Sequence, residues 1–399
     1  MRVLLINYEY PPIGAGAANA TAYIARAMAR LGHHPVVLTA AYADLPRRSE
    51  EDGIEVIRVA ARRARADRSN LFEMATFVAS AALALPSVIR SRKPDGAIVF
   101  FSMPCGPLGL LGRWFANLPY VVSLRGGDVP GTEPGLSRVY TLLGPIRRLV
   151  LRKALAVVAN SSGLKELSEA ADPVGVLVIP NGVDTEHFRV SATDSVRPFT
   201  FLFVGRFQKQ KNLPLLLNAI AALRCQTDQR FRVVLVGDGP LRELLETTAA
   251  ELGLGDVVSW HGWCRKQELL TRYQEADCFL NPSEYEGMPN TVLEAMACGL
   301  PVIASAVPGN DAVVSPHETG LLFESGSSGE LVAAMSWMLG DPARARALGH
   351  AGRKRVEREF SWPRVAEGYV GLLAGRATGA EGQDQVTKGP PDPLESTAR

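Results

Sequence analysis

The 399-residue sequence is poor in the residues that metal centres and disulfide frameworks need. Its five cysteines are odd in number, scattered, and form no CxxC pair, which is typical of a reducing compartment. It contains no HExxH, no DxD, no paired Cys/His set, no GxSxG nucleophile elbow and no phosphate-binding loop ending in GK[ST]. These absences argue against a bound metal, serine-type hydrolysis and P-loop chemistry.

Net charge is also small, with 43 Lys and Arg against 41 Asp and Glu. A net charge of +2 argues against the basic face of a nucleic-acid binder, so we expect no nucleic-acid partner. Residues 1–190 hold 22 basic and 16 acidic residues, and the remainder holds 21 and 25. The basic run between Arg58 and Arg68 is either a solvated face or a surface for an anionic membrane or a phosphorylated acceptor.

Long hydrophobic runs are absent as well. The first residues, MRVLLINYEYPP, carry one basic residue and an apolar run of strand length, which is not the pattern of an export signal. The longest weakly polar stretch, Met74–Ile89, is interrupted by Pro86 and is shorter than the roughly 20 residues that span a bilayer. We therefore expect a cytoplasmic protein without a transmembrane helix, with peripheral contact at the inner face of the membrane left open.

What the sequence does contain is an alternation of short apolar runs with longer segments of helical spacing. This alternation is typical of βα units with parallel sheets, whose strands are buried on both faces. The predicted strands are Val3–Asn7, Val36–Thr39, Ile54–Val59, Ala97–Phe101, Tyr120–Leu124, Val157–Ala159, Val176–Ile179, Phe199–Val204, Phe231–Val236, Val257–Trp260, Cys278–Asn281, Val302–Ala304 and Gly320–Phe323.

The predicted fold class is α/β, with two Rossmann-like doubly wound domains facing each other across a cleft. We place the first domain at 1–184, a linker at 185–197, the second domain at 198–361, a final helix at 362–375 and a disordered tail at 376–399. Doubly wound sheets bind ligands at the carboxyl ends of their strands, so the site should draw on loops of both domains.

Two loops of the second domain carry the strongest candidates. After the strand that ends at Val204, Gly205 permits a sharp turn, and Arg206 and Lys211 place two cations beside a helix start, an arrangement that suits a diphosphate. After the strand that ends at Asn281, Glu286 lies on a loop and Glu294 inside the following helix. Their carboxylates can accept hydrogen bonds from separate hydroxyl pairs of one extended ligand.

Two loops of the first domain are further candidates. The loop containing Gly14 and Gly16 is either pressed against a substrate bound from the opposite domain or a structural turn. The loop Arg125–Asp128 either holds sugar hydroxyls through Arg125 and Asp128 or is a salt-bridged turn.

In order and spacing, these elements resemble a bacterial family-four glycosyltransferase, a group of retaining enzymes with the GT-B fold. The resemblance extends to about Leu373. It rests on E-x7-E from Glu286 to Glu294 and GR-x4-KN from Gly205 to Asn212. Weaker agreements are the opening PP-x-G-x-G, the GH at Gly32–His33 and IPNGVD at Ile179–Asp184.

The resemblance implies a role for each of these residues. Arg206 and Lys211 would hold the donor diphosphate, Glu286 the donor sugar and Glu294 the ribose. Gly16 would lie under the diphosphate, and the final helix would cross back to the acceptor-binding first domain. The backbone of Gly287, Met288, Pro289 and Asn290 would cradle sugar and phosphate, and Gly205 is a further residue expected at the donor site.

The resemblance further implies transfer of a hexose-type sugar from a UDP-, GDP- or similar sugar with retention of configuration, without metal or cofactor. The chain departs from the family at Arg125-Gly126-Gly127-Asp128, where many members have His-Gly-x-Asp, and at Pro308-Gly309-Asn310-Asp311, where Gly-Gly/Pro-Glu is common. The resemblance leaves the acceptor open among a glycan, a lipid-linked intermediate and a small metabolite. A nucleotide-sugar epimerase and a catalytically silent sugar-nucleotide-binding subunit remain alternative interpretations.

Overall fold

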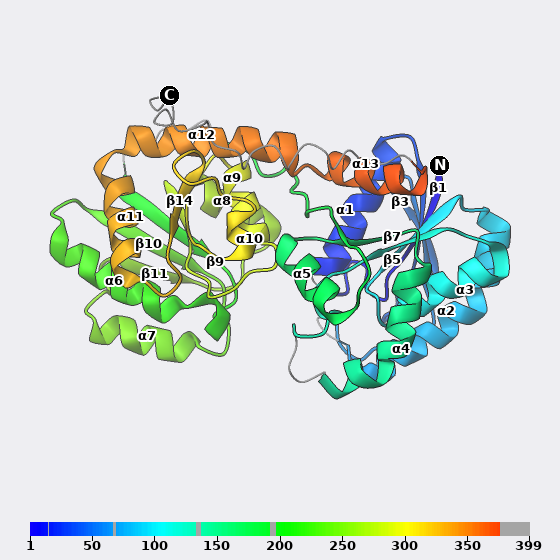
Figure 1. Ribbon diagram of the computed structural model, residues 1–399. Coiled ribbons are helices and arrows are strands. Elements are labelled where there is room, and N and C mark those ends of the chain that lie inside the picture. The colour runs from blue at the N-terminus through cyan, green and yellow to red at the C-terminus, as the bar shows by residue number, and fades with distance from the viewer. Residues whose placement is uncertain (15, 67–68, 133–136, 192–196, 376–399) are drawn as a thin grey trace, which may run out of the picture.

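The computed structural model describes residues 1–14, 16–66, 69–132, 137–191 and 197–375. The predicted disordered tail at 376–399 lies outside the described residues, as does part of the predicted linker. The described chain forms two α/β domains that lie side by side, joined along one edge by the last two helices (Figure 1).

The first domain is built on an eight-stranded sheet with the order β3-β4-β2-β1-β5-β6-β7-β8. Its strands pair in parallel except for β3, which runs antiparallel to β4. Its elements are β1 (Arg2–Ile6), α1 (Gly16–Arg30), β2 (His34–Ala40), β3 (Arg48–Glu51), β4 (Ile54–Val59), α2 (Leu71–Arg92), β5 (Gly96–Phe100), α3 (Gly106–Ala116), β6 (Tyr120–Ser123), α4 (Ser137–Lys153), β7 (Ala156–Ala159), α5 (Ser162–Ala171) and β8 (Leu177–Val178).

The second domain has a six-stranded parallel sheet with the order β11-β10-β9-β12-β13-β14. A short 3-10 turn, Lys209–Lys211, follows its first strand. Its other elements are β9 (Phe199–Val204), α6 (Leu213–Gln226), β10 (Phe231–Val236), α7 (Arg242–Glu251), β11 (Val258–His261), α8 (Lys266–Gln274), β12 (Cys278–Asn281), α9 (Asn290–Ala297), β13 (Val302–Ser305), α10 (Pro308–Asp311), β14 (Gly320–Phe323), α11 (Ser328–Gly340), α12 (Pro342–Glu359) and α13 (Trp362–Leu373).

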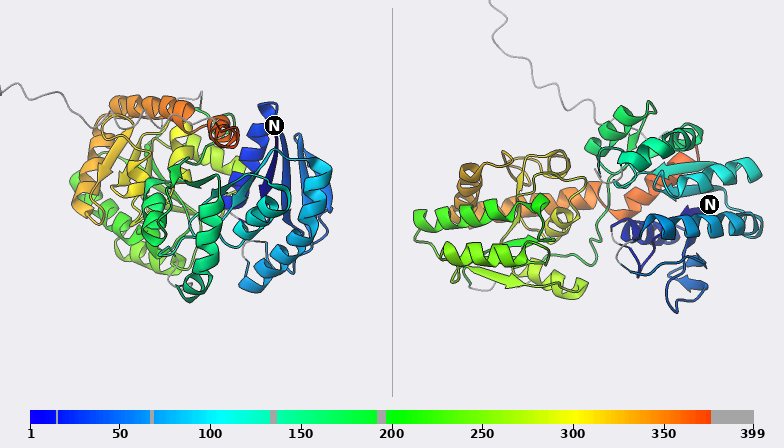
Figure 2. Two further views of the ribbon diagram at one scale, coloured as in Figure 1. Left: turned by 45° about the vertical axis from the view of Figure 1, so that its right-hand side comes forward. Right: turned by 90° about the horizontal axis from the view of Figure 1, so that it is seen from below.

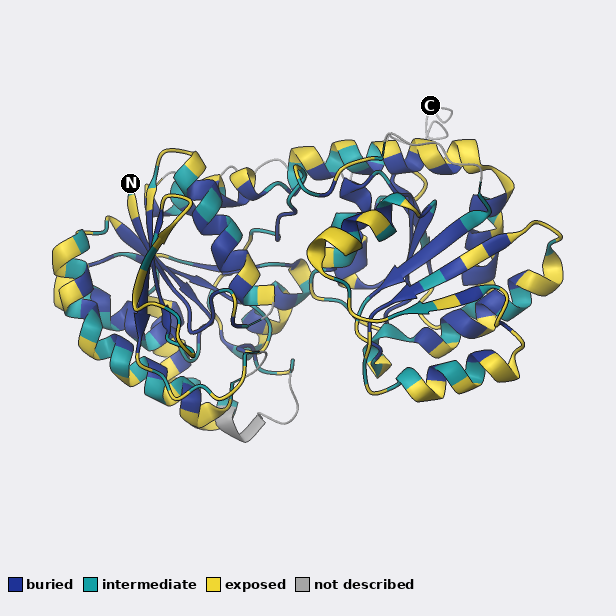
Figure 3. Cartoon of the chain, turned by 180° about the vertical axis from the view of Figure 1, so that it is seen from behind, coloured by how far each residue is buried: buried dark blue, intermediate teal, exposed yellow. Residues whose placement is uncertain are grey.

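The central strands of both sheets are buried between the helices (Figure 3). Strands such as β5 and β6 are buried along their whole length, because a parallel sheet covered on both sides exposes neither set of alternating side chains. In the first domain α1 packs on α13, whereas α2 packs on α3 and α3 on α4. Right-handed crossovers place α2, α3 and α4 together on the other face from α1. The predicted doubly wound α/β class is confirmed.

Two local features differ from the sequence-based expectation. Strand β3 has the sequence RSEE and lies mostly exposed at the sheet edge, so it has no apolar pattern and was not predicted. Helix α2 continues through Pro86, although the proline suggested an interruption. The buried side chains Phe77, Ala81 and Leu85 anchor the helix on both sides of that position.

The last two helices join the domains. Helix α12 lies along the second domain and α13 along the first (Figures 1 and 2). Trp362 and Tyr369 of α13 belong to the hydrophobic core of the first domain. The backbone N–H of Val183 donates to the Phe360 carbonyl over 2.8 Å. At Gly182 an added Cβ would lie 2.8 Å from the Trp362 backbone nitrogen, so a glycine is needed where the two chain segments cross.

Candidate active site

A cavity of about 380 Å³ lies between the domains, at the carboxyl ends of strands from both sheets. Gly16 and Asn19 come from the start of α1, which follows β1, while Asn290 and Glu294 come from α9, which follows β12. Parallel sheets leave their ligand loops at this edge. The cavity is lined by Gly16, Asn19, Ala20, Tyr23, Asn181, Gly182, Val183, Asp184, Phe188, Lys266, Leu269, Asn290, Glu294 and Trp362.

Lys211 and Glu286 form a close ion pair at the carboxyl edge of the second sheet. The Lys211 Nζ lies 2.5 Å from Glu286 Oε1, and the side chains are 16% and 7% exposed. The Ser283 hydroxyl donates to the same oxygen over 2.7 Å, and the Asn281 amide lies 3.5 Å from it. Among the described residues no partner is seen for Glu286 Oε2, so this oxygen can accept a hydrogen bond from a ligand.

Four buried polar residues support this pair and were not singled out as site residues from the sequence. Asn281 donates to Asn310 Oδ1 over 2.9 Å, and Asn310 in turn donates to the Ser305 carbonyl over 2.9 Å. Ser283 and Ser305 are fully buried with them. The sequence signal that could have identified three of them is a polar residue at the end of an apolar strand or just after it. Asn281, Ser283 and Ser305 all show this pattern. The network fixes the carboxylate of Glu286 before any ligand arrives.

Backbone contacts hold the two ligand loops of the second domain together. The Glu284 backbone N–H donates to the Gln210 carbonyl over 2.8 Å, and the Gln210 side-chain Nε2 donates to the Tyr285 carbonyl over 2.8 Å. Gly309 lets α10 approach the loop, because an added Cβ would lie 2.6 Å from the Glu286 carbonyl oxygen. Gly237 has φ +137°, and its Cβ would overlap the Gly205 carbonyl oxygen. These glycines therefore set the loop geometry.

Arg206 is placed differently from Lys211. It is exposed, and its guanidinium forms no ion pair or hydrogen bond with the residues that the structure describes. The loop before α9 places Gly287 in solvent, Met288 half-buried and Pro289 buried at the helix cap, with Asn290 exposed at the first helical position. The start of α9 thus presents backbone to the cleft beside Lys211 and Glu286.

Glu294 lines the cavity one helical turn further along α9. Its Oε2 accepts a hydrogen bond from the Tyr273 hydroxyl over 2.9 Å. Burial raises the pKa of Glu294 to about 7, and the Tyr273 hydrogen bond opposes that rise only in part. Burial therefore favours the protonated carboxyl group well above the pH at which an exposed glutamate ionises.

This raised pKa predicts a specific pH dependence of stability. The pKa is higher in the folded chain than the value near 4.5 of an exposed Glu, so folded-state stability falls as pH rises from about 4.5 to 7. Glu294→Gln should be more stable than the wild type at pH 8, by up to about 3 kcal/mol, and equal at pH 4.5. Urea unfolding at both pH values measures this difference. The exposed Glu251→Gln is the control, and an equal gain at both pH values would contradict the assignment.

Asp128 is held away from the cavity by its own loop. It is 2% exposed, and its two carboxylate oxygens accept from the backbone N–H groups of Ser102 at 2.5 Å and Arg125 at 3.0 Å. Arg147 donates to its carbonyl oxygen over 3.2 Å. This geometry favours the turn interpretation for Asp128 over contact with a sugar, because both carboxylate oxygens already tie together the loops after β5 and β6.

Arg125 instead connects the first domain to α9. Its Nη1 donates to Asn181 Oδ1 over 2.7 Å, and the Asn181 amide donates to Asn290 Oδ1 over 3.1 Å. A second link crosses the cleft at Lys266, whose Nζ lies 2.6 Å from the Tyr23 hydroxyl and 3.1 Å from Asp184 Oδ2. These contacts align the loops of the two domains.

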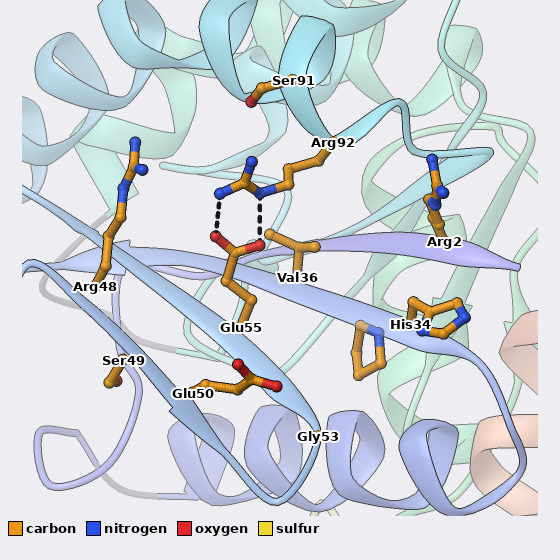
Figure 4. Close-up of a pocket in the computed structure, with 11 residues that line it drawn as sticks. Arg2, His34, Val36, Arg48, Ser49, Glu50, Gly53, Glu55, Ser91 and Arg92 are labelled. Atoms are coloured by element: carbon orange, nitrogen blue, oxygen red, sulfur yellow. Dashed lines mark hydrogen bonds and ion pairs between the residues drawn. The ribbon is translucent and has the colours of Figure 1, made fainter.

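A larger cavity, of about 630 Å³, lies elsewhere. It is at the amino ends of β1 and β2, the opposite edge of the sheet from the ligand loops (Figure 4). Arg92 in its wall forms two 2.5 Å hydrogen bonds with Glu55, so its positive charge is already matched. Across the described parts of the chain, no group of three or more His, Cys, Asp or Glu residues is placed to hold a metal ion.

Comparison with known proteins identifies the family. Residues 15–182 match the glycosyl transferase 4-like domain, and residues 183–355 match glycosyl transferases group 1. The alpha-maltose-1-phosphate synthase of Mycolicibacterium smegmatis is 30% identical over 292 residues, which cover 66% of this chain and 74% of that protein. The chain belongs to the family-four glycosyltransferases.

Two further similarities define how far the family membership reaches. The D-inositol 3-phosphate glycosyltransferase of Segniliparus rotundus is 33% identical over 268 residues, 62% of this chain and 57% of that protein. The chain thus spans little more than half the length of that relative. The sucrose-phosphate synthase of Thermosynechococcus elongatus superposes with a TM-score of 0.76 at 26% identity, covering 94% of this chain and 98% of that one. The family-four glycosyltransferase described here therefore has the GT-B fold.

Proposed function

We propose that this protein transfers a hexose-type sugar from a nucleoside diphosphate sugar to a hydroxyl group of a glycan, lipid-linked or small-molecule acceptor, with retention of anomeric configuration. The observation that supports this most is the Lys211–Glu286 pair at the carboxyl edge of the second sheet, beside the exposed Arg206 and the start of α9. Family membership supports the same reaction class. The relatives and solved structure above are transferases or synthases, so we do not carry the epimerase forward.

The donor diphosphate would bind where positive charge is concentrated. Arg206 and Lys211 supply two cations, and the N-terminus of α9 adds backbone N–H groups and a positive dipole end. Glu286 Oε2 would accept from a hydroxyl of the donor sugar, and Glu294 would accept from the ribose hydroxyls. The backbone of Gly205 and of Gly287–Asn290 would lie against the sugar and phosphates.

The reaction would proceed by attack on the same face that the leaving group departs from. The acceptor oxygen forms a bond to the anomeric carbon while the bond from that carbon to the diphosphate oxygen breaks, and the acceptor proton passes to the departing phosphate oxygen. Glu286 is the carboxylate that the structure pairs with Lys211, and its Oε1 already accepts from Lys211 and Ser283, so we assign it no role as a general base. Arg206 and Lys211 would stabilise the negative charge that develops on the diphosphate. We propose that neither metal nor cofactor takes part.

The direct test is a panel of UDP and GDP hexoses incubated with candidate acceptors in the presence of EDTA. We expect release of one nucleoside diphosphate and a product whose anomeric proton coupling in NMR matches that of the donor. A thermal-shift series with UDP, GDP and ADP should identify the base by the largest stabilisation. Donor isomerisation, inversion at the anomeric carbon, or saturable donor binding with no transfer to any acceptor would each contradict the proposal.

Gly16 offers a test that separates stability from catalysis. An added Cβ at Gly16 meets nothing within 4 Å, and the residue opens onto the interdomain cavity at the start of α1. Gly16→Val should therefore fold normally but fill the space that we assign to the diphosphate, raising the KM for the donor at least about 10-fold. Gly16→Ala should have a smaller effect. The matched control is Gly255→Val, which also meets nothing within 4 Å, and an unchanged donor KM in Gly16→Val would remove Gly16 from the donor site.

The partners and location follow from the same proposal. We propose a cytoplasmic enzyme whose partners are a nucleotide sugar and a hydroxyl-bearing acceptor, with no nucleic acid. The relatives' names point to different acceptors, D-inositol 3-phosphate in one case and a maltose-1-phosphate product in the other.

A further inference from the structure

Helices α2, α3 and α4 lie together on the first domain (Figure 1). Each of them exposes large apolar side chains, α3 only in its last turn. Leu83 is 85% exposed, Leu142 is 78% exposed and Trp114 is 65% exposed. We call the outer surface of these three helices the α2–α4 face. Its exposed large apolar side chains are Leu71, Phe72, Leu83, Trp114, Phe115, Leu142, Ile146 and Leu149.

Helix α2 shows the pattern most clearly. Phe72, Ala75, Ala79 and Leu83 are exposed and spaced three or four residues apart, so they form one outward stripe. Between Leu71 and Ile89 the one charged residue is Glu73, which is buried and caps the helix start. In an ordinary surface helix, this outward side would carry charged and polar residues.

By length and composition, α2 alone among the described helices could cross a membrane. Its opposite side is nevertheless part of the domain, because Phe77, Ala81, Leu85 and Val88 are packed in the core. The helix therefore lies along the sheet and presents only one apolar side to the outside. A helix that is embedded on one side and apolar on the other fits an interface with lipid better than a membrane span.

Charge on the three helices has one sign. Apart from the buried Glu73, they contain no acidic residue. Arg90, Arg152 and Lys153 are exposed and form no ion pair with the described residues, whereas the exposed Arg148 pairs with Asp172. Two further arginines of these helices are already paired, Arg92 with Glu55 and the buried Arg147 with Asp172.

We propose that the α2–α4 face binds the surface of an anionic lipid bilayer. Apolar side chains would enter the region between headgroups and acyl chains, and the cations would lie among the lipid phosphates. The exposed charges of the α2–α4 face are all positive. This favours a bilayer over a second copy of the chain, because a dimer through this face would place positive charges opposite each other.

The α2–α4 face also reaches the edge of the cleft. Helices α2 and α4 follow the strands β4 and β6, so both begin at the carboxyl edge of the sheet, where the interdomain cavity lies. Arg63, in the loop between β4 and α2, forms an ion pair with Glu9 in the loop after β1. A bilayer on this face would present a lipid-linked acceptor to the cleft, a consequence that rests on the proposed transferase function.

Flotation of the full-length protein with vesicles tests the membrane proposal without any catalytic assay. We expect binding to phosphatidylcholine vesicles containing 30% phosphatidylglycerol at 50 mM KCl, weaker binding at 500 mM KCl, and little binding to phosphatidylcholine alone. Arg90→Gln/Arg152→Gln/Lys153→Gln should weaken binding by about 100-fold, since each cation near such a surface contributes about fivefold. Phe72→Gln/Leu83→Gln should weaken it by at least about 10-fold at either salt concentration.

Matched controls come from exposed positions of the second domain. Leu244→Gln and Arg230→Gln/Arg232→Gln change the same residue types away from the α2–α4 face and should bind like the wild type. All variants are compared by circular dichroism and thermal unfolding, so a folding defect is seen directly.

Three outcomes would overturn the membrane proposal. These are no binding of the wild type to anionic vesicles, equal loss in the control variants, or a dimer in light scattering that Phe72→Gln/Leu83→Gln converts to a monomer without any vesicle binding. Transfer to a soluble acceptor in the same preparation would leave the proposed transferase function intact in each case. Conversely, vesicle binding with no transfer to any acceptor would uphold the surface and reject the proposed function.

Discussion

Lys211→Met is expected to lower kcat for sugar transfer by about 100-fold or more. A loss of this size is typical when an enzyme loses one preorganised hydrogen-bond donor that stabilises a developing negative charge. Lys211 is the cation nearest to Glu286, at 2.5 Å, and its side chain is only 16% exposed. Arg206→Ala should cause a loss of similar size. The neighbouring Lys209, exposed on the same 3-10 turn, provides the matched control, and Lys209→Met should keep nearly full activity.

A double-mutant cycle with Glu286→Gln separates two roles of Lys211. If Lys211 binds the diphosphate, Lys211→Met weakens binding of the free nucleoside diphosphate, whereas Glu286→Gln does not. If Lys211 acts only by holding Glu286, the double variant is no slower than Glu286→Gln alone. Titration calorimetry with the free nucleoside diphosphate and steady-state kinetics give both readouts. Wild-type rates in Lys211→Met and Arg206→Ala would remove both cations from the mechanism.

Arg147→Met is expected to produce the largest loss of stability, about 3 kcal/mol or more in the free energy of unfolding. Arg147 is 2% exposed and pairs with the buried Asp172. It also donates to Ser168 Oγ and to the Asp128 carbonyl, both over 3.2 Å. Removing the guanidinium leaves the buried Ser168 hydroxyl without this donor and leaves the buried Asp172 carboxylate with only the half-exposed Arg148 as its cation. The cost of this weakened pairing of a buried charge exceeds the packing that methionine restores.

Arg148 supplies the comparison for this prediction. It contacts the same Asp172 over 3.0 Å, but its side chain is 47% exposed, so Arg148→Met should cost no more than about 1 kcal/mol. Urea unfolding followed by circular dichroism measures both variants. Equal effects of the two substitutions would show that burial of Arg147 does not decide the stability of this ion pair.

Much of the fold was predictable because parallel strands buried on both faces are continuous apolar runs. The runs at Val3–Asn7 and Phe199–Val204 correspond to β1 and β9 with little change in bounds. The same rule explains the failure at β3, since RSEE at an exposed sheet edge carries no apolar pattern. Pro86 was misleading for a related reason, because packing of Phe77 and Leu85 outweighs the missing backbone hydrogen bond at one position.

The candidate site was predictable only where residues are close in sequence. The motifs containing Lys211 and Glu286 mark two loops, but nothing local states that Nζ and Oε1 meet. The support from Asn310 to Asn281 joins residues 29 positions apart. Asp128 was ambiguous although its loop is a single short segment. A Gly-Gly-Asp loop is compatible with a carboxylate that faces the cleft and with one that faces its own backbone.

The sequence by itself determined the doubly wound architecture and the family, because hydrophobic periodicity and motif order are properties of the linear chain. The tertiary structure decided which charged groups face one another, which of them face the cavity, and that three helices share one apolar and cationic surface. Those outcomes depend on strand order and crossover handedness, which bring together side chains from distant parts of the chain.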